Sequence, residues 1–229
     1  MVSATELVRA AAAAGVSVLA VTDHDTFSAI SEARDAGLEL GVDVVAGEEV
    51  TTEAPARVHV LGLFLQGPVR MGMTVVDTVR AIHDQGGLAV LAHPFMPTYF
   101  ASITPSALRR LISQQPVDGI EVRHTAVTTA SRVRQLDSFY QLHQDRLGAA
   151  IGSSDSHFGE RDLARTVTVF PGRTAADLRQ AMVARQTIPL EKYRQPPGPA
   201  LGTRLQQQAR SMGWLAWQRW RGNIGREGA

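Results

Sequence analysis

The 229-residue sequence contains no cysteine. This absence excludes disulfide bonds, thiolate metal sites and a cysteine nucleophile, so any bound metal must be held by His, Asp and Glu. Long apolar runs are missing as well, since no segment approaches the roughly 18 apolar residues of a membrane span. Glu6 and Arg9 interrupt the alanine-rich first segment, which lacks the cleavage site of a signal peptide. We therefore expect a cytoplasmic protein without stable membrane insertion.

Hydrophobic residues make up 44% of the chain and charged residues 20%, a composition typical of one globular domain with a sizeable core. The net charge of +1 is unevenly distributed. Residues 192–229 carry seven Lys or Arg and one acidic residue, which leaves residues 1–191 mildly acidic. The sequence therefore indicates an acidic body followed by a basic tail.

Apolar, β-rich segments alternate along the chain with segments of helical period. The expected strands lie at residues 16–21, 42–50, 58–64, 88–95, 117–124, 147–157, 165–170 and 187–190. The expected helices lie at residues 3–15, 26–41, 74–87, 104–115, 129–146 and 174–186. Repeated β–α units form a parallel sheet that is covered by helices. This pattern predicts an α/β fold and favours a barrel of the (β/α)7 type over an open sheet.

Ionisable side chains gather at the ends of the predicted strands. They are Asp23, His24, Asp25, Glu48, Glu49, His59, His93, Glu121, His124, Asp155 and His157. In a β/α barrel the carboxyl ends of the strands form one face, so these residues are expected to converge. Imidazole nitrogens and carboxylate oxygens together suit Zn, Mn or Fe. Two or three such ions would activate water for hydrolysis, most often of a phosphate ester.

Each of these residues also has a simpler interpretation. A single histidine at a strand end is more often a hydrogen-bonded structural residue, and Asp25 is expected to be the N-cap of the next helix. Asp155 alone could cap a turn. The repetition at strand after strand favours metal binding over these alternatives. Because neighbouring residues of a strand face opposite ways, only one of Glu48 and Glu49 should point toward the site.

Six segments, in this order, resemble the polymerase and histidinol phosphatase (PHP) domain family: VLAVTDHDT, VVAGEEVTT, VHVLGLF, VLAHPF, GIEVRH and IGSSDSHFG. The resemblance covers residues 1 to about 190. It implies a distorted, seven-stranded TIM-like barrel with a trinuclear metal site. It also implies hydrolysis of phosphoesters.

The resemblance assigns roles to individual residues. It implies that the metal ligands are His24, Glu49, His93, His124, Asp155 and His157, with Glu49 bridging two ions. His59 is similar to a family histidine for which metal ligation and substrate contact are both open. The guanidinium group of Arg161 suits a phosphate, although a solvated loop arginine is an equal alternative. Asp23 is expected to orient the metal ligands by contacting them without binding the metal itself.

Members of the family begin with a strand that carries an H-x-H motif. This sequence starts within the segment that follows that motif, so we expect a TIM-like barrel that lacks its first strand. Two explanations are open: the true start lies upstream, or the chain is truncated and has a partial metal site. The remaining ligand motifs are intact, which favours the first explanation.

The β–α pattern ends after residue 190, so residues 1–190 are expected to form the barrel. Residues 191–203 are rich in Pro and Gly and are interpreted as a linker, and residues 204–229 as a short basic helical tail. Trp214, Trp217 and Trp220 would share one helical face beside several arginines. Contact with nucleic acid, contact with a membrane surface, and packing against the barrel or a partner chain all stay open.

The sequence thus predicts a phosphoesterase that depends on two or three divalent metal ions (Mn, Zn or Fe). Its substrate would be a phosphate mono- or diester, such as a nucleotide, a small phosphate ester or a short oligonucleotide. A hydrolase that acts on a carbonyl or cyclic amide could use the same ions. The non-enzymatic alternative is a degenerate, inactive barrel that serves as a binding or assembly module.

Overall fold

The computed structural model describes residues 2–96, 101–125, 129–157 and 162–192. All elements named below belong to the unit Met1–Tyr193. Arg161, most of the predicted linker at 191–203, and the predicted tail at 204–229 with its tryptophans lie outside the described residues.

Helices and strands alternate along most of the described chain, as the sequence pattern predicts. The helices are α1 (Ala4–Ala13), α2 (Ile30–Leu40), α3 (Val75–Asp84), α4 (Pro105–Gln114), α5 (Ala130–Leu147) and α6 (Ala175–Val183). The strands are β1 (Val18–Val21), β2 (Asp43–Thr51), β3 (His59–Leu63), β4 (Leu88–Leu91), β5 (Gly119–His124), β6 (Ala149–Ser153), β7 (Thr166–Val169) and β8 (Ile188–Glu191). Each element predicted within residues 1–190 has a counterpart, although α2 begins later than its prediction.

Side-chain caps begin several helices at the predicted positions. The hydroxyl of Ser3 accepts a hydrogen bond from the backbone N–H of Glu6, whose carboxylate accepts from Ser3 in return. Thr104 caps α4, which has a proline in its first turn, and Thr174 forms a second capping box at α6. Such caps satisfy N–H groups that have no partner within the helix, and each typically contributes about 1 kcal/mol.

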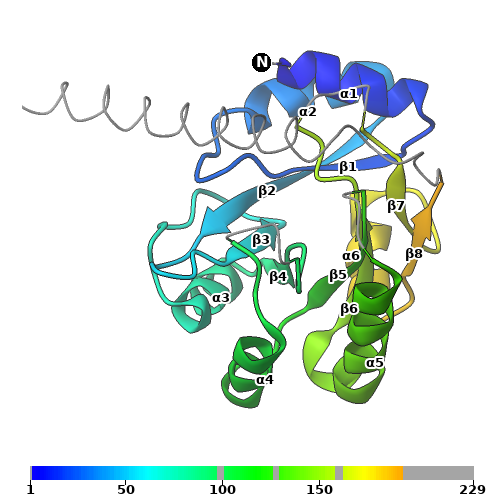
Figure 1. The fold of residues 1–229 in the computed structure, drawn as a ribbon. Helices are drawn as coiled ribbons and strands as arrows, with labels where there is room; N and C mark the ends of the chain where they lie inside the picture. Colours follow the sequence, from blue (N-terminus) through cyan, green and yellow to red (C-terminus); the bar gives the residue numbers. More distant parts are fainter. Residues whose placement is uncertain (1, 97–100, 126–128, 158–161, 193–229) are drawn as a thin grey trace, which may run out of the picture. The chain divides into compact units, whose positions relative to one another are not determined.

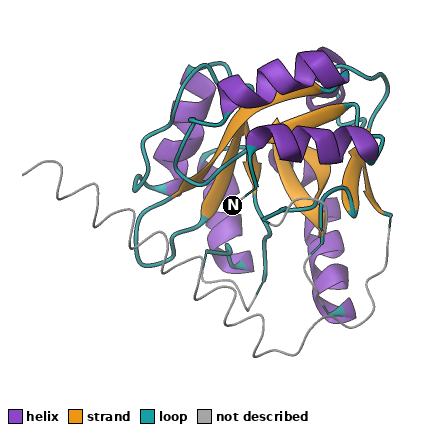
Figure 2. Cartoon of the chain, turned by 90° about the horizontal axis from the view of Figure 1, so that it is seen from above, coloured by secondary structure: helices purple, strands orange, loops and turns teal. Residues whose placement is uncertain are grey.

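Six strands form one sheet in the order β1-β2-β3-β4-β5-β6. The pairs β1–β2, β4–β5 and β5–β6 are parallel. Figures 1 and 2 show that this sheet curls around an interior and that helices such as α3, α4 and α5 lie outside it. The described part of the chain is therefore an α/β fold with a curled, largely parallel sheet, which is consistent with a TIM-like architecture.

The prediction of an all-parallel sheet is wrong at β3, which is antiparallel to both β2 and β4. The cause is the short connection at residues 52–58, because a parallel pair needs a much longer crossover. This reversal brings the start of β3 to the edge at which the parallel strands end. His59, the first residue of β3, pairs with Thr51 at the end of β2.

The predicted strands at 165–170 and 187–190 also depart from a (β/α)7 pattern. They pair only with each other within the described residues, as the antiparallel ribbon β7–β8. The ribbon meets β6 through the hydroxyl of Thr168, which accepts from the N–H of Gly152 at 3.0 Å and donates to its carbonyl at 2.9 Å. A side chain at Gly152 would clash, since its Cβ would lie 2.4 Å from the carbonyl oxygen of Val167.

Apolar side chains fill both faces of the curled sheet. The outer face packs against α3, α4 and α5 through buried residues such as Leu91, Ile120 and Ile82. The inner face contains a smaller cluster to which β2, β3, β4, β6 and α6 contribute, with Val45, Val90 and Met182 among its members. Because side chains alternate along a strand, Val45 and Glu49 share the inner face of β2. The inner face is therefore apolar where β2 begins and acidic near its end.

No helix in the described part of the chain has the length and apolar character that a membrane crossing requires.

Candidate metal centre

Five histidines that are far apart in the sequence form a continuous series of neighbouring rings. In spatial order they are His157, His24, His59, His93 and His124, with ring centroids 5.7, 4.8, 5.2 and 5.9 Å apart. They come from the residues after β1, β4 and β6, from the start of β3 and from the end of β5. The other two histidines, at 83 and 143, lie on α3 and α5 and are not members of this series.

Glu49 lies at the middle of the histidine series and contacts three of its members. Its Oε1 is 2.8 Å from Nδ1 of His59 and 3.2 Å from Nε2 of His93. Its Oε2 is 3.5 Å from Nδ1 of His24. The carboxylate is therefore shared by three imidazoles from three separate parts of the chain.

The protonation of this group follows from its contacts. Burial by itself raises the pKa of Glu49, but hydrogen bonds from His59 and His93 outweigh burial and hold the pKa well below its usual value. Burial lowers the pKa of His93, yet the hydrogen bond to Glu49 and the nearby carboxylates raise it overall. Glu49 is therefore ionised at neutral pH, as a metal ligand must be.

Asp155 organises the other end of the histidine series. Its Oδ2 lies 3.2 Å from Nε2 of His124, and its Oδ1 lies 3.4 Å from Nε2 of His157. Burial raises the pKa of Asp155, but the hydrogen bond with His124 and the neighbouring imidazoles lower it overall. His157 is the most accessible of the five, with 52% of its side chain exposed, whereas His124 is buried. The histidine series thus runs from a buried end to an open end.

A β-bulge turns His124 toward this site. Ile120 and Val122 of β5 belong to the outer apolar cluster, so regular alternation would also direct residue 124 outward. The register between β5 and β6 shifts between Glu121 and Arg123, which inserts an extra residue into β5. Bulges of this kind reorient side chains next to functional sites.

The two adjacent glutamates of β2 face opposite ways, as strand alternation predicts. Glu49 faces the imidazoles, whereas Oε2 of Glu48 accepts a hydrogen bond from the backbone N–H of Val69 at 2.7 Å. Glu48 is only 1% exposed, and burial raises its pKa.

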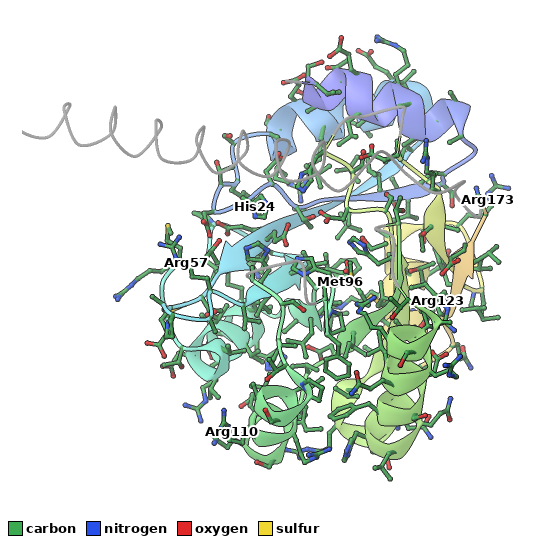
Figure 3. All side chains as sticks on the ribbon, viewed as in Figure 1. His24, Arg57, Met96, Arg110, Arg123 and Arg173 are labelled. Atoms are coloured by element: carbon green, nitrogen blue, oxygen red, sulfur yellow. The ribbon has the colours of Figure 1, made fainter. Side chains whose placement is uncertain are left out.

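The turn after β1 is fastened to β2 beside Glu49, and Figure 3 shows His24 next to that strand. The predicted N-cap role of Asp25 is wrong, because α2 begins at Ile30 and its N-cap residue makes no side-chain cap. Instead, Oδ1 of Asp25 accepts from the N–H of Thr51 at 2.7 Å. The side chain of Asp23 is exposed and its backbone carbonyl accepts from Glu49, so its predicted orienting role stays a prediction.

Two buried charged residues beside the site received no role from the sequence. Glu121, which is 2% exposed, accepts a hydrogen bond from the backbone N–H of His93 at 2.7 Å. Arg132, in the first turn of α5, donates to the carbonyls of Pro94 and Phe95. The position of Glu121, a charged residue inside the apolar segment GIEV, could have indicated a role at the site. Nothing in the local sequence distinguishes Arg132 from a surface arginine.

The geometry fits a metal ion. One ligand atom from each of His24, Glu49 and His59 lies within 4.8 Å of the others. Imidazole and carboxylate donors in the absence of thiolates suit Zn, Mn and Fe. This group can therefore hold a divalent ion, and His93 contacts the same carboxylate oxygen as His59.

Comparison with known proteins places the fold. No protein-family model matches the sequence. An uncharacterised protein of Methanocaldococcus jannaschii is 37% identical over 109 residues, 47% of this chain and 58% of that protein. A 5'-3' exoribonuclease of Haemophilus influenzae is 45% identical over 64 residues, 28% of this chain and 23% of the enzyme. The matches thus cover less than two thirds of the length of these relatives.

Among solved structures, a "two-domain protein containing predicted PHP-like metal-dependent phosphoesterase" from Bacteroides vulgatus is similar, with a TM-score of 0.63 and 22% identity. The match covers 81% of this chain and 59% of that one. The resemblance predicted from the motifs is thereby confirmed at the level of the fold: this chain has the fold of a PHP-like domain.

Proposed function

We propose that the chain is a metal-dependent phosphoesterase that hydrolyses a phosphate mono- or diester. The observation that carries this proposal is the Glu49 carboxylate, which three imidazoles from separate parts of the chain share. Four of the five histidines lie at the carboxyl ends of strands, and the reversal of β3 brings the fifth, His59, to the same edge of the sheet. Such a costly arrangement of buried polar groups is typical of functional sites.

We assign the predicted ligands to two groups around Glu49. His24 and His59 would hold one ion together with Glu49, since their ligand atoms lie close together. His93 and His124 would hold a second ion together with Glu49 and Asp155. His157 would complete the open end of the site through its contact with Asp155.

Bound divalent ions supply Lewis acidity and bring the pKa of bound water toward neutrality. The chain contributes the charges that hold them. Glu49 and Asp155 both have lowered pKa values and are ionised at neutral pH, which compensates cationic groups in a partly buried site. A metal ion competes with protons for the imidazole nitrogen of His93, whose pKa is raised, so metal affinity should increase with pH.

The substrate class follows less directly. The exoribonuclease of Haemophilus influenzae, which matches part of this chain, supports a nucleotide or short oligonucleotide. A small phosphate ester is compatible with the same donor set. Arg161 stays our candidate for contact with the substrate phosphate.

The test is elemental analysis of the purified chain, followed by hydrolysis assays with Mn, Zn or Fe. Bis-p-nitrophenyl phosphate, p-nitrophenyl phosphate and a short oligonucleotide would separate diesterase, monoesterase and nuclease activity. We expect His124→Ala and Asp155→Asn to lose metal and activity. His143→Gln is the matched control, because that histidine lies on α5 against the ring of Phe139.

Two results would contradict the proposal. Stoichiometric metal with hydrolysis of an amide but of no phosphate ester would indicate a carbonyl hydrolase. A folded chain that binds none of these metals and hydrolyses none of these substrates would favour the binding or assembly module.

A further inference from the structure

The loop that follows β4, Ala92–Met96, is buried over its whole length. Two of its residues, His93 (φ 30°) and Phe95 (φ 62°), adopt the left-handed region that L residues rarely occupy. In β4, Leu88 and Val90 face inward, whereas Leu91 faces outward. Regular alternation would also send His93 outward, so the left-handed backbone is what lets its ring reach Glu49.

Glu121 holds the first peptide of this loop from the neighbouring strand. Its Oε2 accepts from the backbone N–H of His93 at 2.7 Å, a short hydrogen bond to a carboxylate. The pairing of Leu91 with Ile120 brings Glu121 to this position. Nε2 of His124 lies farther away, at 4.0 Å from the same oxygen.

Other backbone groups of the loop have partners as well. The guanidinium of Arg132 donates to the carbonyl of Phe95 at 2.8 Å and to that of Pro94. The hydroxyl of Ser102 donates to the carbonyl of His93 and accepts from the N–H of Met96, both at 2.8 Å. Side chains from β5, α5 and the segment before α4 thus fix the loop from three directions.

A carboxylate on the N–H side and a guanidinium on the C=O side complement the dipoles of the peptides between them. Both side chains are buried, Glu121 to 2% and Arg132 to 9% exposure, so each would be costly without these partners. The result is a defined position for His93, whose Nε2 lies 3.2 Å from Glu49 and 3.2 Å from Nδ1 of His59.

We propose that Glu121 and Arg132 are positioning residues that hold the Ala92–Met96 loop so that Nε2 of His93 is presented to the second metal position beside Glu49. This inference rests on the proposed metal centre. Partners behind a metal ligand typically change metal affinity by about 10- to 100-fold when they are removed. The ion held by His24, Glu49 and His59 should be affected much less.

Glu48 offers a matched control within the same fold. It is a buried strand carboxylate that accepts a backbone N–H at 2.7 Å, as Glu121 does, but its partner Val69 carries no metal ligand. Substitution of either glutamate should therefore disturb folding to a similar degree. Only substitution of Glu121 should change metal binding.

The experiment is titration calorimetry of the folded variants Glu121→Gln, Glu121→Ala, Arg132→Met and Glu48→Gln with Mn. We expect Glu121→Ala and Arg132→Met to weaken one of the metal sites by about 10- to 100-fold. Glu121→Gln keeps an acceptor oxygen and should therefore retain most of the metal affinity that Glu121→Ala loses. Glu48→Gln should bind Mn as tightly as the wild type does. Equal affinity in Glu121→Ala and the wild type would overturn the proposal. So would equal losses in Glu121→Gln and Glu121→Ala, since Glu121 would then act as a metal ligand.

A readout on the metal-free protein separates this inference from the proposed function. The backbone amide proton of His93 should resonate far downfield in the ¹H–¹⁵N spectrum and should move upfield in Glu121→Ala. A wild-type chain that binds no metal but shows this shift would refute the metal centre and leave the positioning contact supported. An unchanged His93 amide in Glu121→Ala would refute the contact itself.

Discussion

Replacement of Glu49 by glutamine should abolish metal-dependent stabilisation of the fold. The substitution conserves volume and keeps one acceptor oxygen, but it removes the negative charge that His24, His59 and His93 share. Because the same carboxylate contacts both proposed metal positions, a single substitution should weaken both.

The size of the effect follows from mass action. A metal ion at 100 times its dissociation constant stabilises the folded state by about 2.7 kcal/mol. For a domain of this size, 1 kcal/mol corresponds to about 2–4 °C in Tm. Saturation of one site should therefore raise the Tm of the wild type by about 5–10 °C. A second occupied site would add to this increment.

The assay is thermal unfolding followed by circular dichroism, with and without Mn or Zn. Each protein is compared with its own metal-free form, because the lowered pKa of Glu49 also stabilises the metal-free fold above pH 4.5. Glu49→Gln should gain less than about 2 °C from the metal, whereas the control Glu48→Gln should gain as much as the wild type. A full increment in Glu49→Gln would refute the assignment of Glu49 as the shared ligand.

Two further predictions concern stability rather than metal binding. Gly152→Ala should cost about 1–3 kcal/mol in urea unfolding, because its Cβ would lie 2.4 Å from the backbone carbonyl oxygen of Val167; an unchanged midpoint would show that the β7–β8 ribbon does not pack on β6 as described. Burial raises the pKa of Glu48 above 4.5, so the carboxyl group binds its proton more tightly in the folded state than in the unfolded state. Protonated Glu48 therefore stabilises the fold at low pH, and this contribution is lost as the pH rises through the raised pKa. Glu48→Gln should therefore reduce the loss of unfolding free energy between pH 4.5 and neutrality, and an identical pH profile in wild type and variant would contradict this reasoning.

The convergence of the strand-end residues could be predicted because it depends on local pattern alone. Apolar strands and helical segments alternate, and the carboxyl ends of parallel strands meet on one edge. That rule brings His24, His93 and Asp155 to this edge, although the ring of His93 also needs the left-handed backbone of its loop to reach Glu49. It does not suffice for His59, which starts a strand, because only the reversal of β3 brings it to this edge.

Other features depend on contacts between distant parts of the chain. Asp25 has the residue type and spacing of an N-cap, yet its carboxylate bonds to Thr51 of a neighbouring strand. Glu121 and Arg132 bond to loop residues that lie 28 and 37 positions away in the sequence. Sequence periodicity carries no information about such partners, and the bulge that redirects His124 is equally hidden from it.

The most direct test of the account is a crystal structure of the Mn-loaded chain with anomalous data collected at the manganese edge. The account predicts an anomalous peak within about 2.0–2.6 Å of a Glu49 carboxylate oxygen, close to ring nitrogens of His24 and His59. If the crystallised protein retains stoichiometric metal but every anomalous peak lies away from Glu49, the proposed metal centre would be contradicted.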